Sequence, residues 1–291
     1  MRRSKPRFRS RPVAAEVGVL TGFHPVREAL RARRRPLRRL CLQGSARTEW
    51  EELRSLAVEA GVPVVERSAA PPELQGSGQT PWVWLEAGAL PEVELAALLA
   101  AATGPTGTLI ALDGVEDPQN LGAIVRVAEA SGVSGLVLTR RHAPPLSDAV
   151  ARASAGALEW LPVCRVPNLS RALRAAKEAG FWVIGADPDA PTGVFDAPAA
   201  WLRGPRVLVL GAEGEGLRQG VLQEIDHRVR IPMSGQVASL NVSAASAVLL
   251  FELTRRDGVA SRTTEAGPGV GQGRSLTHRT PAPTPFSSGA G

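Results

Sequence analysis

The feature that most constrains the fold of this chain is the alternation of short apolar runs with helix-like segments between residues 107 and 257. The runs expected to form strands are Thr108–Leu112, Gly135–Thr139, Leu158–Cys164, Phe181–Ala186, Arg206–Leu210 and Arg228–Ile231. The segments expected to form helices are Asn120–Ser131, Ser147–Ala153, Leu169–Ala179, Leu217–Glu224 and Asn241–Arg255. Such alternation is typical of a parallel sheet with helices on both faces. The sequence therefore predicts an α/β domain over residues 107–257.

A second, smaller α/β domain is predicted over residues 18–87. The segments expected to form its helices and strands are His24–Arg33, Leu37–Leu42, Thr48–Ala60, Val62–Glu66 and Trp82–Glu86. Residues 88–106 are interpreted as a linker that contains one helix, Leu90–Ala102. Residues 1–17 are basic, residues 258–291 are rich in Gly, Pro, Ser and Thr, and neither end has an apolar period. We expect both ends to be disordered.

Two short basic segments stand out from an otherwise acidic chain. Residues 1–12 and residues 31–39 each hold six basic and no acidic residues. The remaining 22 basic residues stand against 28 acidic ones. Basic segments of this kind bind polyphosphates such as RNA through Arg–phosphate pairs and counterion release. A solubilising tail and a solvated helix end explain the same composition, and the Arg-rich start is also compatible with a mitochondrial transit peptide.

Composition argues against several classes of protein. No apolar run is long enough to cross a membrane and none follows the basic start as in a signal peptide, so we expect a cytoplasmic protein with no membrane partner. Cys41 and Cys164 lie in apolar, strand-like surroundings and are expected to be small buried side chains. The two cysteines and four histidines show no CxxC or HxxxH spacing, so no metal site is expected.

Three segments combine glycines with polar side chains at strand ends or helix starts: Asn120 to Arg126, Leu210 to Gly216 and Ile231 to Ser243. In an α/β sheet, a nucleotide-type cofactor is held beyond the carboxyl ends of the strands. Each segment also has a simpler interpretation. Asn120 can be a helix cap and Arg126 a solvated side chain, and the glycines of the second segment can form a plain turn. In the third segment, Ser239 or Asn241 is expected to cap the final helix.

Taken together and in this order, the three segments resemble the three motifs of the SpoU/TrmH family of RNA ribose 2′-O-methyltransferases, which belongs to the SPOUT superfamily. The resemblance covers about residues 20–255. It implies a C-terminal SPOUT domain whose chain forms a deep trefoil knot and holds S-adenosylmethionine in a bent shape, largely through backbone groups. The residues that the resemblance assigns to this cofactor are Leu210, Gly211, Ile231, Met233 and Leu240.

The resemblance also implies a catalytic, substrate-side set: Asn120, Arg126, Glu213, Ser239 and Asn241. In the family, the arginine that Arg126 matches either activates the ribose 2′-hydroxyl or positions the flanking phosphate. We expect positioning, because a guanidinium stays protonated under nearly all protein conditions. Glu213 is the alternative base, or a support for Arg126. Methyl transfer from a sulfonium needs no metal, so none is expected.

The phrase from Gly22 to Leu30 resembles the opening of a small RNA-binding domain found in the longer members of the family. The loop from Ser77 to Pro81 departs from a His-Gln-Gly phrase that relatives often carry. The two-domain length is most similar to the subgroup that methylates a guanosine of 23S ribosomal RNA, and the family resemblance implies a homodimer. A tRNA ribose methyltransferase, a mitochondrial rRNA enzyme, an rRNA-methylating resistance enzyme and a non-catalytic RNA-binding assembly factor remain open alternatives.

Overall fold

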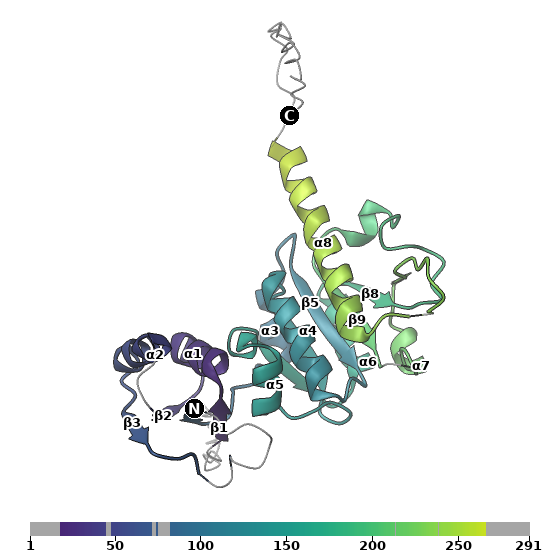
Figure 1. Cartoon of the computed structure of the whole chain (residues 1–291). Coiled ribbons are helices and arrows are strands. Elements are labelled where there is room, and N and C mark those ends of the chain that lie inside the picture. Colours follow the sequence, from purple (N-terminus) through teal and green to yellow (C-terminus); the bar gives the residue numbers. More distant parts are fainter. Residues whose placement is uncertain are drawn as a thin grey trace, which may run out of the picture.

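The computed structural model describes residues 18–44, 48–71, 74, 82–212, 214–237 and 239–265, which form two sheets with helices packed against them (Figure 1). The small sheet has the order β1-β4-β2-β3, in which β2 and β3 are parallel and β4 is antiparallel to both of its neighbours. Its elements are β1 (Gly18–Thr21), α1 (Phe23–Ala32), β2 (Leu37–Gln43), α2 (Thr48–Glu59), β3 (Val64–Arg67) and β4 (Val83–Ala87).

The large sheet has the order β10-β8-β9-β5-β6-β7, and every neighbouring pair of strands is parallel. The predicted α/β fold with a parallel sheet is therefore confirmed. The elements of this part are α3 (Leu95–Ala101), β5 (Thr108–Asp113), α4 (Pro118–Ala130), β6 (Gly135–Thr139), α5 (Asp148–Ala153), η2 (Ala157–Glu159), β7 (Val163–Val166), α6 (Leu169–Glu178), β8 (Trp182–Ala186), η3 (Ala199–Leu202), β9 (Arg206–Gly211), α7 (Gln219–Leu222), β10 (His227–Val229) and α8 (Val242–Glu265).

Side chains of the central strand β5 enter two different cores, because successive side chains alternate across a strand. Ile110 and Leu112 belong to one apolar cluster with residues of α4, α5 and α8. Leu109 and Ala111 belong to a second cluster with residues of α3 and α6. Both faces of β5 are thus covered, which explains why this strand is apolar without interruption from Leu109 to Leu112.

Prolines explain two predicted boundaries that are wrong. Helix α3 begins at Leu95 rather than Leu90, because the residue before Pro91 disfavours helical backbone and Val93 N–H instead donates to the Val163 carbonyl at 2.9 Å. Strand β7 begins at Val163 rather than Leu158, since Pro162 lacks the N–H that a sheet ladder uses. The residues before Pro162 form the short turn η2 instead.

The last helix is longer than predicted. Helix α8 continues beyond Arg255 to Glu265, so residues 258–265 are helical rather than disordered. No proline occurs between Pro232 and Pro268, and the single Gly258 lowers helix stability without ending the helix. The rest of both ends that we expect to be disordered lies outside the described residues. Although α8 is long, no helix in the described part of the chain is apolar enough to cross a membrane.

The small sheet unit is fixed to the large one by buried and half-buried polar contacts. Arg35 Nη2 lies 2.6 Å from Glu159 Oε1, and both side chains are almost fully buried. Trp160 Nε1 donates to Glu28 Oε2 at 2.8 Å, and Thr21 Oγ1 donates to Asp148 Oδ2 at 2.8 Å. The short elements η2 and α5 of the large unit therefore contact α1 and β1 of the small one.

Several arginines of the basic segment 31–39 pair with acidic residues of the protein, although only Arg35 among them is buried, so RNA binding by this segment stays a prediction. Arg35 pairs with Glu159, Arg39 pairs with Glu86 at 2.7 Å, and Arg31 lies 3.3 Å from Glu28. Charge composition could not reveal the pairs of Arg35 and Arg39, because their partners are 124 and 47 residues away in sequence. The segment 1–12 lies outside the described residues.

Candidate functional site

The candidate site lies at the carboxyl edge of the large sheet. Because its strands are all parallel, their carboxyl ends meet along one edge. Strand β5 ends in Asp113 and its neighbour β9 ends in Gly211, and these two residues lie side by side in the sheet register. The loops that leave these strands enclose two adjoining cavities, described below as the large cavity and the small cavity.

The large cavity has a volume of about 730 Å³, within the usual range for small-molecule sites. The sequence segments that begin at Leu210 and at Ile231 form much of its wall. All the residues assigned to the cofactor line it, together with two of the substrate-side set: Leu210, Gly211, Ile231, Met233, Leu240, Ser239 and Asn241. The structure therefore brings together two segments that are separated in sequence.

Gly211 is required by a close approach of backbone. A Cβ atom at this position would lie 2.3 Å from the carbonyl carbon and oxygen of Gly216, which is far closer than real contacts. The loop after β9 folds back on itself here, with Gly216 N–H donating to the Ala212 carbonyl at 3.0 Å. The wall of the large cavity beside Gly211 is consequently formed by backbone, as a site that grips a ligand through main-chain groups requires.

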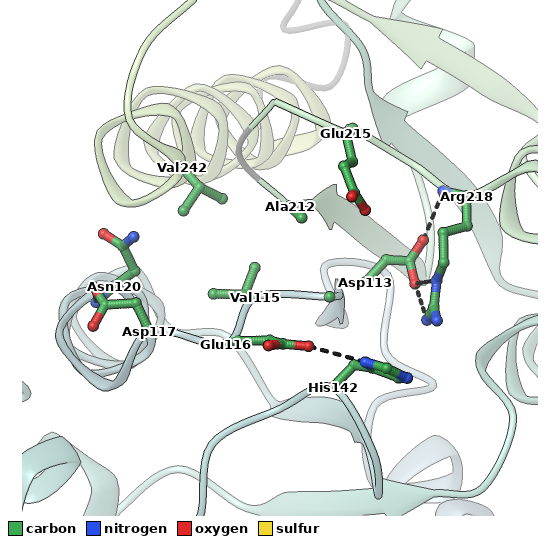
Figure 2. A pocket seen from close by; sticks show the side chains of 12 residues that line it. Asp113, Val115, Glu116, Asp117, Asn120, His142, Ala212, Glu215, Arg218 and Val242 are labelled. Carbon is green, nitrogen blue, oxygen red and sulfur yellow. Dashed lines mark hydrogen bonds and ion pairs between the residues drawn. The ribbon is translucent and has the colours of Figure 1, made fainter.

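The small cavity, about 420 Å³, adjoins the large one and is lined by charged and amide side chains (Figure 2). Four residues line both cavities: Ala212, Glu215, Gly216 and Val242. Asn120 lies on the small-cavity side, and Asn241 Nδ2 donates to Asn120 Oδ1 at 3.0 Å. The first and third sequence segments thus meet where the two cavities join.

The structure shows which residues cap the helices α4 and α8, and so whether Asn120 and Asn241 act as helix caps. Asp117 caps α4, because its carboxylate accepts from Gln119 N–H at 3.1 Å and from Asn120 N–H at 3.2 Å. The side chain of Asn120 is therefore not needed as a cap. Asn241 Oδ1 accepts from Ser243 N–H at 2.9 Å at the start of α8, so the expected cap of the final helix is Asn241 rather than Ser239.

Two ion pairs in the small cavity were missed by the sequence interpretation. Asp113 is fully buried and accepts three hydrogen bonds from Arg218: from the backbone N–H at 2.8 Å, from Nε at 2.7 Å and from Nη2. Figure 2 shows this pair on one side of the cavity and the pair of His142 Nδ1 with Glu116 Oε1, 2.9 Å apart, on another. The sequence feature that could have indicated the first pair is Asp113 itself, a charged residue that ends an uninterrupted apolar strand.

Comparison with known proteins identifies the family. Residues 107–251 match the SpoU rRNA Methylase family. An RlmB 23S rRNA (guanosine-2′-O-)-methyltransferase from Ralstonia nicotianae is 37% identical over 247 residues, which cover 83% of this chain and 96% of that protein. The chain belongs to the SpoU rRNA methylase family. A Burkholderia protein of the same name is 50% identical over 148 residues, which cover 51% of this chain.

Coverage of the SpoU relatives differs from one protein to another. For the Burkholderia protein and three others, the matched part of the chain spans between 38% and 60% of the relative's length. Among solved structures, the SpoU methyltransferase AviRb from Streptomyces viridochromogenes superposes with a TM-score of 0.69 at 26% identity, covering 84% of this chain and 91% of that one. An AdoMet-bound rRNA methyltransferase from Sinorhizobium meliloti gives a TM-score of 0.66 at 26% identity, covering 82% and 87%.

One of the residues expected in a SpoU site, Arg126, does not lie at the cavities. Arg126 is exposed on α4, lines neither cavity, and makes no hydrogen bond or ion pair with the described residues. At 1.5 Å per residue, it lies about 9 Å along the helix from Asn120. Glu213 lies outside the described residues. Any role of either residue in the reaction remains a prediction.

The described residues offer no other obvious catalytic chemistry. They contain no cluster of three or more His, Cys, Asp or Glu side chains that could hold a metal ion. Cys41 and Cys164 are buried, as expected, and burial raises the pKa of both thiols. A thiol with a raised pKa is a weak nucleophile at neutral pH.

Proposed function

We propose that this SpoU-family chain transfers a methyl group from S-adenosylmethionine to a ribose 2′-hydroxyl of RNA, and that its target is a guanosine of 23S ribosomal RNA. The observation that carries the proposal is the large cavity, which gathers every residue assigned to the cofactor at the edge of the sheet where such ligands are held. The small cavity adjoins it and offers polar side chains to a second substrate. RlmB relatives act on a guanosine of 23S rRNA by name.

The large cavity fits S-adenosylmethionine in shape and chemistry. Gly211 leaves open backbone where a Cβ atom would collide with Gly216, and Leu210 is buried behind it. Met233 and Leu240 are 40% and 38% exposed at the cavity, so a bound ligand would cover apolar surface there. AviRb and the Sinorhizobium protein each have a structure with AdoMet bound. The trefoil knot and the contacts of individual residues remain predictions from the family resemblance.

The proposed chemistry is a single displacement. When bound, S-adenosylmethionine supplies an activated methyl group on a positively charged sulfur. A bond forms between the 2′-oxygen and the methyl carbon while the carbon–sulfur bond breaks, its electron pair goes to sulfur, and the hydroxyl proton is released. Asn120 and Asn241, hydrogen-bonded to one another at the junction of the cavities, are placed to orient the ribose. Orientation of this kind contributes several kcal/mol to catalysis.

Arg126 requires a different explanation because it lies outside both cavities. We infer that the protein acts as a homodimer in which Arg126 serves a site shared with the second subunit and holds a phosphate beside the ribose. Its exposure and its lack of an ion pair with the described residues support this role, since a free guanidinium is available to a phosphate. Residues 18–87 are proposed to bind the RNA, and Glu213 to support Arg126 or accept the proton.

The substrate is tested by incubating the full chain with labelled S-adenosylmethionine and either a 23S rRNA transcript or unmodified tRNA, then mapping 2′-O-methylated riboses. Label at one guanosine of 23S rRNA is expected. Label on tRNA alone would overturn the choice of RNA. Cofactor binding by calorimetry without label on any RNA would overturn the activity and favour the assembly-factor alternative.

The shared site is tested by mixing two inactive variants. Arg126→Ala keeps the cofactor cavity, whereas Gly211→Ala keeps Arg126. If subunits exchange at random, half of the dimers carry one intact composite site, so about a quarter of the wild-type activity should return on mixing. No recovery in mixtures shown by native mass spectrometry to contain the mixed dimer would exclude a shared site.

A further inference from the structure

A third cavity extends the site along the same edge of the sheet. It has a volume of about 310 Å³ and lies where β6 ends and where α6 and α7 begin. His142 and Arg218 line both this cavity and the small cavity, so the two are neighbours. The polar residues that line it are Thr139, Arg141, His142, Asn168, Ser170 and Arg218.

Arg218 is held at the junction of the two cavities. Its backbone N–H, Nε and Nη2 all donate to Asp113, whose side chain is fully buried, while about half of the Arg218 side chain is exposed. These bonds fix the plane of the guanidinium and leave its remaining donors for a ligand. The loop after β9 and the end of β5 therefore present a cation in a defined position rather than a flexible surface charge.

The loop that carries Arg141 is also held in a defined shape. Thr139 Oγ1 donates to the Arg141 carbonyl, and Arg165 Nη2 donates to the Pro144 carbonyl at 2.6 Å. His142 has a φ of 59°, a left-handed conformation that is uncommon outside glycine and that is often found at functional sites. Both ends of this loop are thus anchored to neighbouring elements.

The third cavity has an excess of positive charge. Asp113 balances Arg218, and Glu116 lies 2.9 Å from His142 Nδ1. Arg141 is exposed and forms no ion pair with the part of the chain that the structure describes. Donors surround the cavity and its lining contains no aromatic ring other than the imidazole of His142, which favours a phosphate over a stacked base.

We propose that this third cavity binds a backbone phosphate of the substrate RNA, next to the nucleotide that is methylated. Arg141 supplies the unbalanced positive charge, Arg218 supplies guanidinium N–H donors held in place by Asp113, and the Ser170 hydroxyl is a further donor. This inference rests on the proposed function, because it assumes that RNA lies along the small cavity. It adds a binding site that does not include Arg126. The RNA strand would then run from the large cavity past Arg218 to Arg141.

The test uses Arg141→Ala and the rescue variant Arg141→Lys, with Arg140→Ala as the matched control. Arg140 is an adjacent exposed arginine that does not line the cavity. Arg218 is left unchanged because its loss would leave Asp113 buried without a partner. For each full-length variant, filter binding to a 23S rRNA transcript is measured against salt, together with KM and kcat for methyl transfer and the Kd for S-adenosylmethionine.

Arg141→Ala should lower the salt slope of RNA binding by about 0.7 to 0.9, the value for one lost phosphate contact. Its KM for RNA should rise about tenfold with little change in kcat, Arg141→Lys should recover most of this loss, and the Kd for S-adenosylmethionine should stay the same. A slope and KM equal to those of Arg140→Ala would overturn the subsite. A reduced slope in a protein that transfers no methyl group would retain the subsite and overturn the proposed function instead.

Discussion

The buried pair of Arg35 and Glu159 gives the strongest stability prediction. Two donor–acceptor contacts, of 2.6 and 3.0 Å, join side chains that are 6% and 0% exposed. With charge centres about 4 Å apart and an effective dielectric constant of about 20, the attraction is about 4 kcal/mol. Burial nevertheless raises the pKa of Glu159 despite the attraction of Arg35, so the cost of desolvating the carboxylate is not fully offset.

Removing one partner of the pair should therefore lower the free energy of unfolding far more than removing both. Arg35→Met leaves a buried carboxylate and Glu159→Met leaves a buried guanidinium, so each should lower the free energy of unfolding by about 3–5 kcal/mol. The double variant Arg35→Met/Glu159→Met should lie within about 1 kcal/mol of the wild type, because neither charge remains. The measurement is urea unfolding followed by the fluorescence of the six tryptophans.

The control is the pair of Arg54 and Glu66, which joins two elements of the small unit at 2.6 Å but is 38% and 72% exposed. Breaking it should change the free energy of unfolding by less than about 1 kcal/mol. Additive effects of Arg35→Met and Glu159→Met, with a coupling energy below about 0.5 kcal/mol, would refute the reasoning. Equal losses at the exposed and the buried pair would refute it as well.

Three further predictions concern the cavities and the last helix. Gly211→Ala should weaken S-adenosylmethionine binding at least tenfold, about 1.4 kcal/mol, because its Cβ would meet the Gly216 backbone. Gly235→Ala, which meets nothing within 4 Å, is the control, and equal calorimetric Kd values would contradict the prediction. Asp113→Asn should loosen the loop that Arg218 anchors, and hydrogen exchange of residues 211–218 should rise; unchanged exchange would show that the pair does not hold the loop. Glu252 has its pKa lowered to about 2, first by the hydrogen bond from Arg255, so its contribution to stability is present above the unfolded value of about 4.5 and is lost as the pH falls toward 2. Melting curves over this range should show a smaller acid-induced loss for Glu252→Gln than for the wild type, and parallel losses would be evidence against the assignment.

The sequence pattern predicts most helices and strands of this fold, because the burial pattern and the backbone preferences of neighbouring residues determine them. The apolar run from Leu109 to Leu112 is a strand buried on both faces, and Gly211 at the end of β9 is required by a backbone contact that any side chain would block. The predicted elements are wrong or missing where tertiary contacts determine the backbone conformation. The extended stretch before α3 depends on Val93 bonding to β7, and the four-residue β1 is too short to be predicted from its pattern.

Charge–charge partners could not be predicted in the same way. Asp113 and Arg218 are 105 residues apart in sequence, and Arg35 and Glu159 are 124 apart. Nothing in the local pattern around Arg35 distinguishes it from its exposed neighbour Arg38. The resemblance to the SpoU family predicted which segments would gather at the large cavity, whereas the place of Arg126 away from both cavities could be seen only in three dimensions.

The fixed contact between the two units limits how the protein can select an RNA. With Arg35 and Glu159 buried between them, the small unit cannot swing toward the cavities without exposing two charges. Because the distance between the two units is fixed, the protein binds an RNA only when the two RNA segments that contact these units are already at the matching distance. For the proposed rRNA substrate, the moment of methylation would then be set by the folding of the RNA during ribosome assembly, and not by a closing movement of the enzyme.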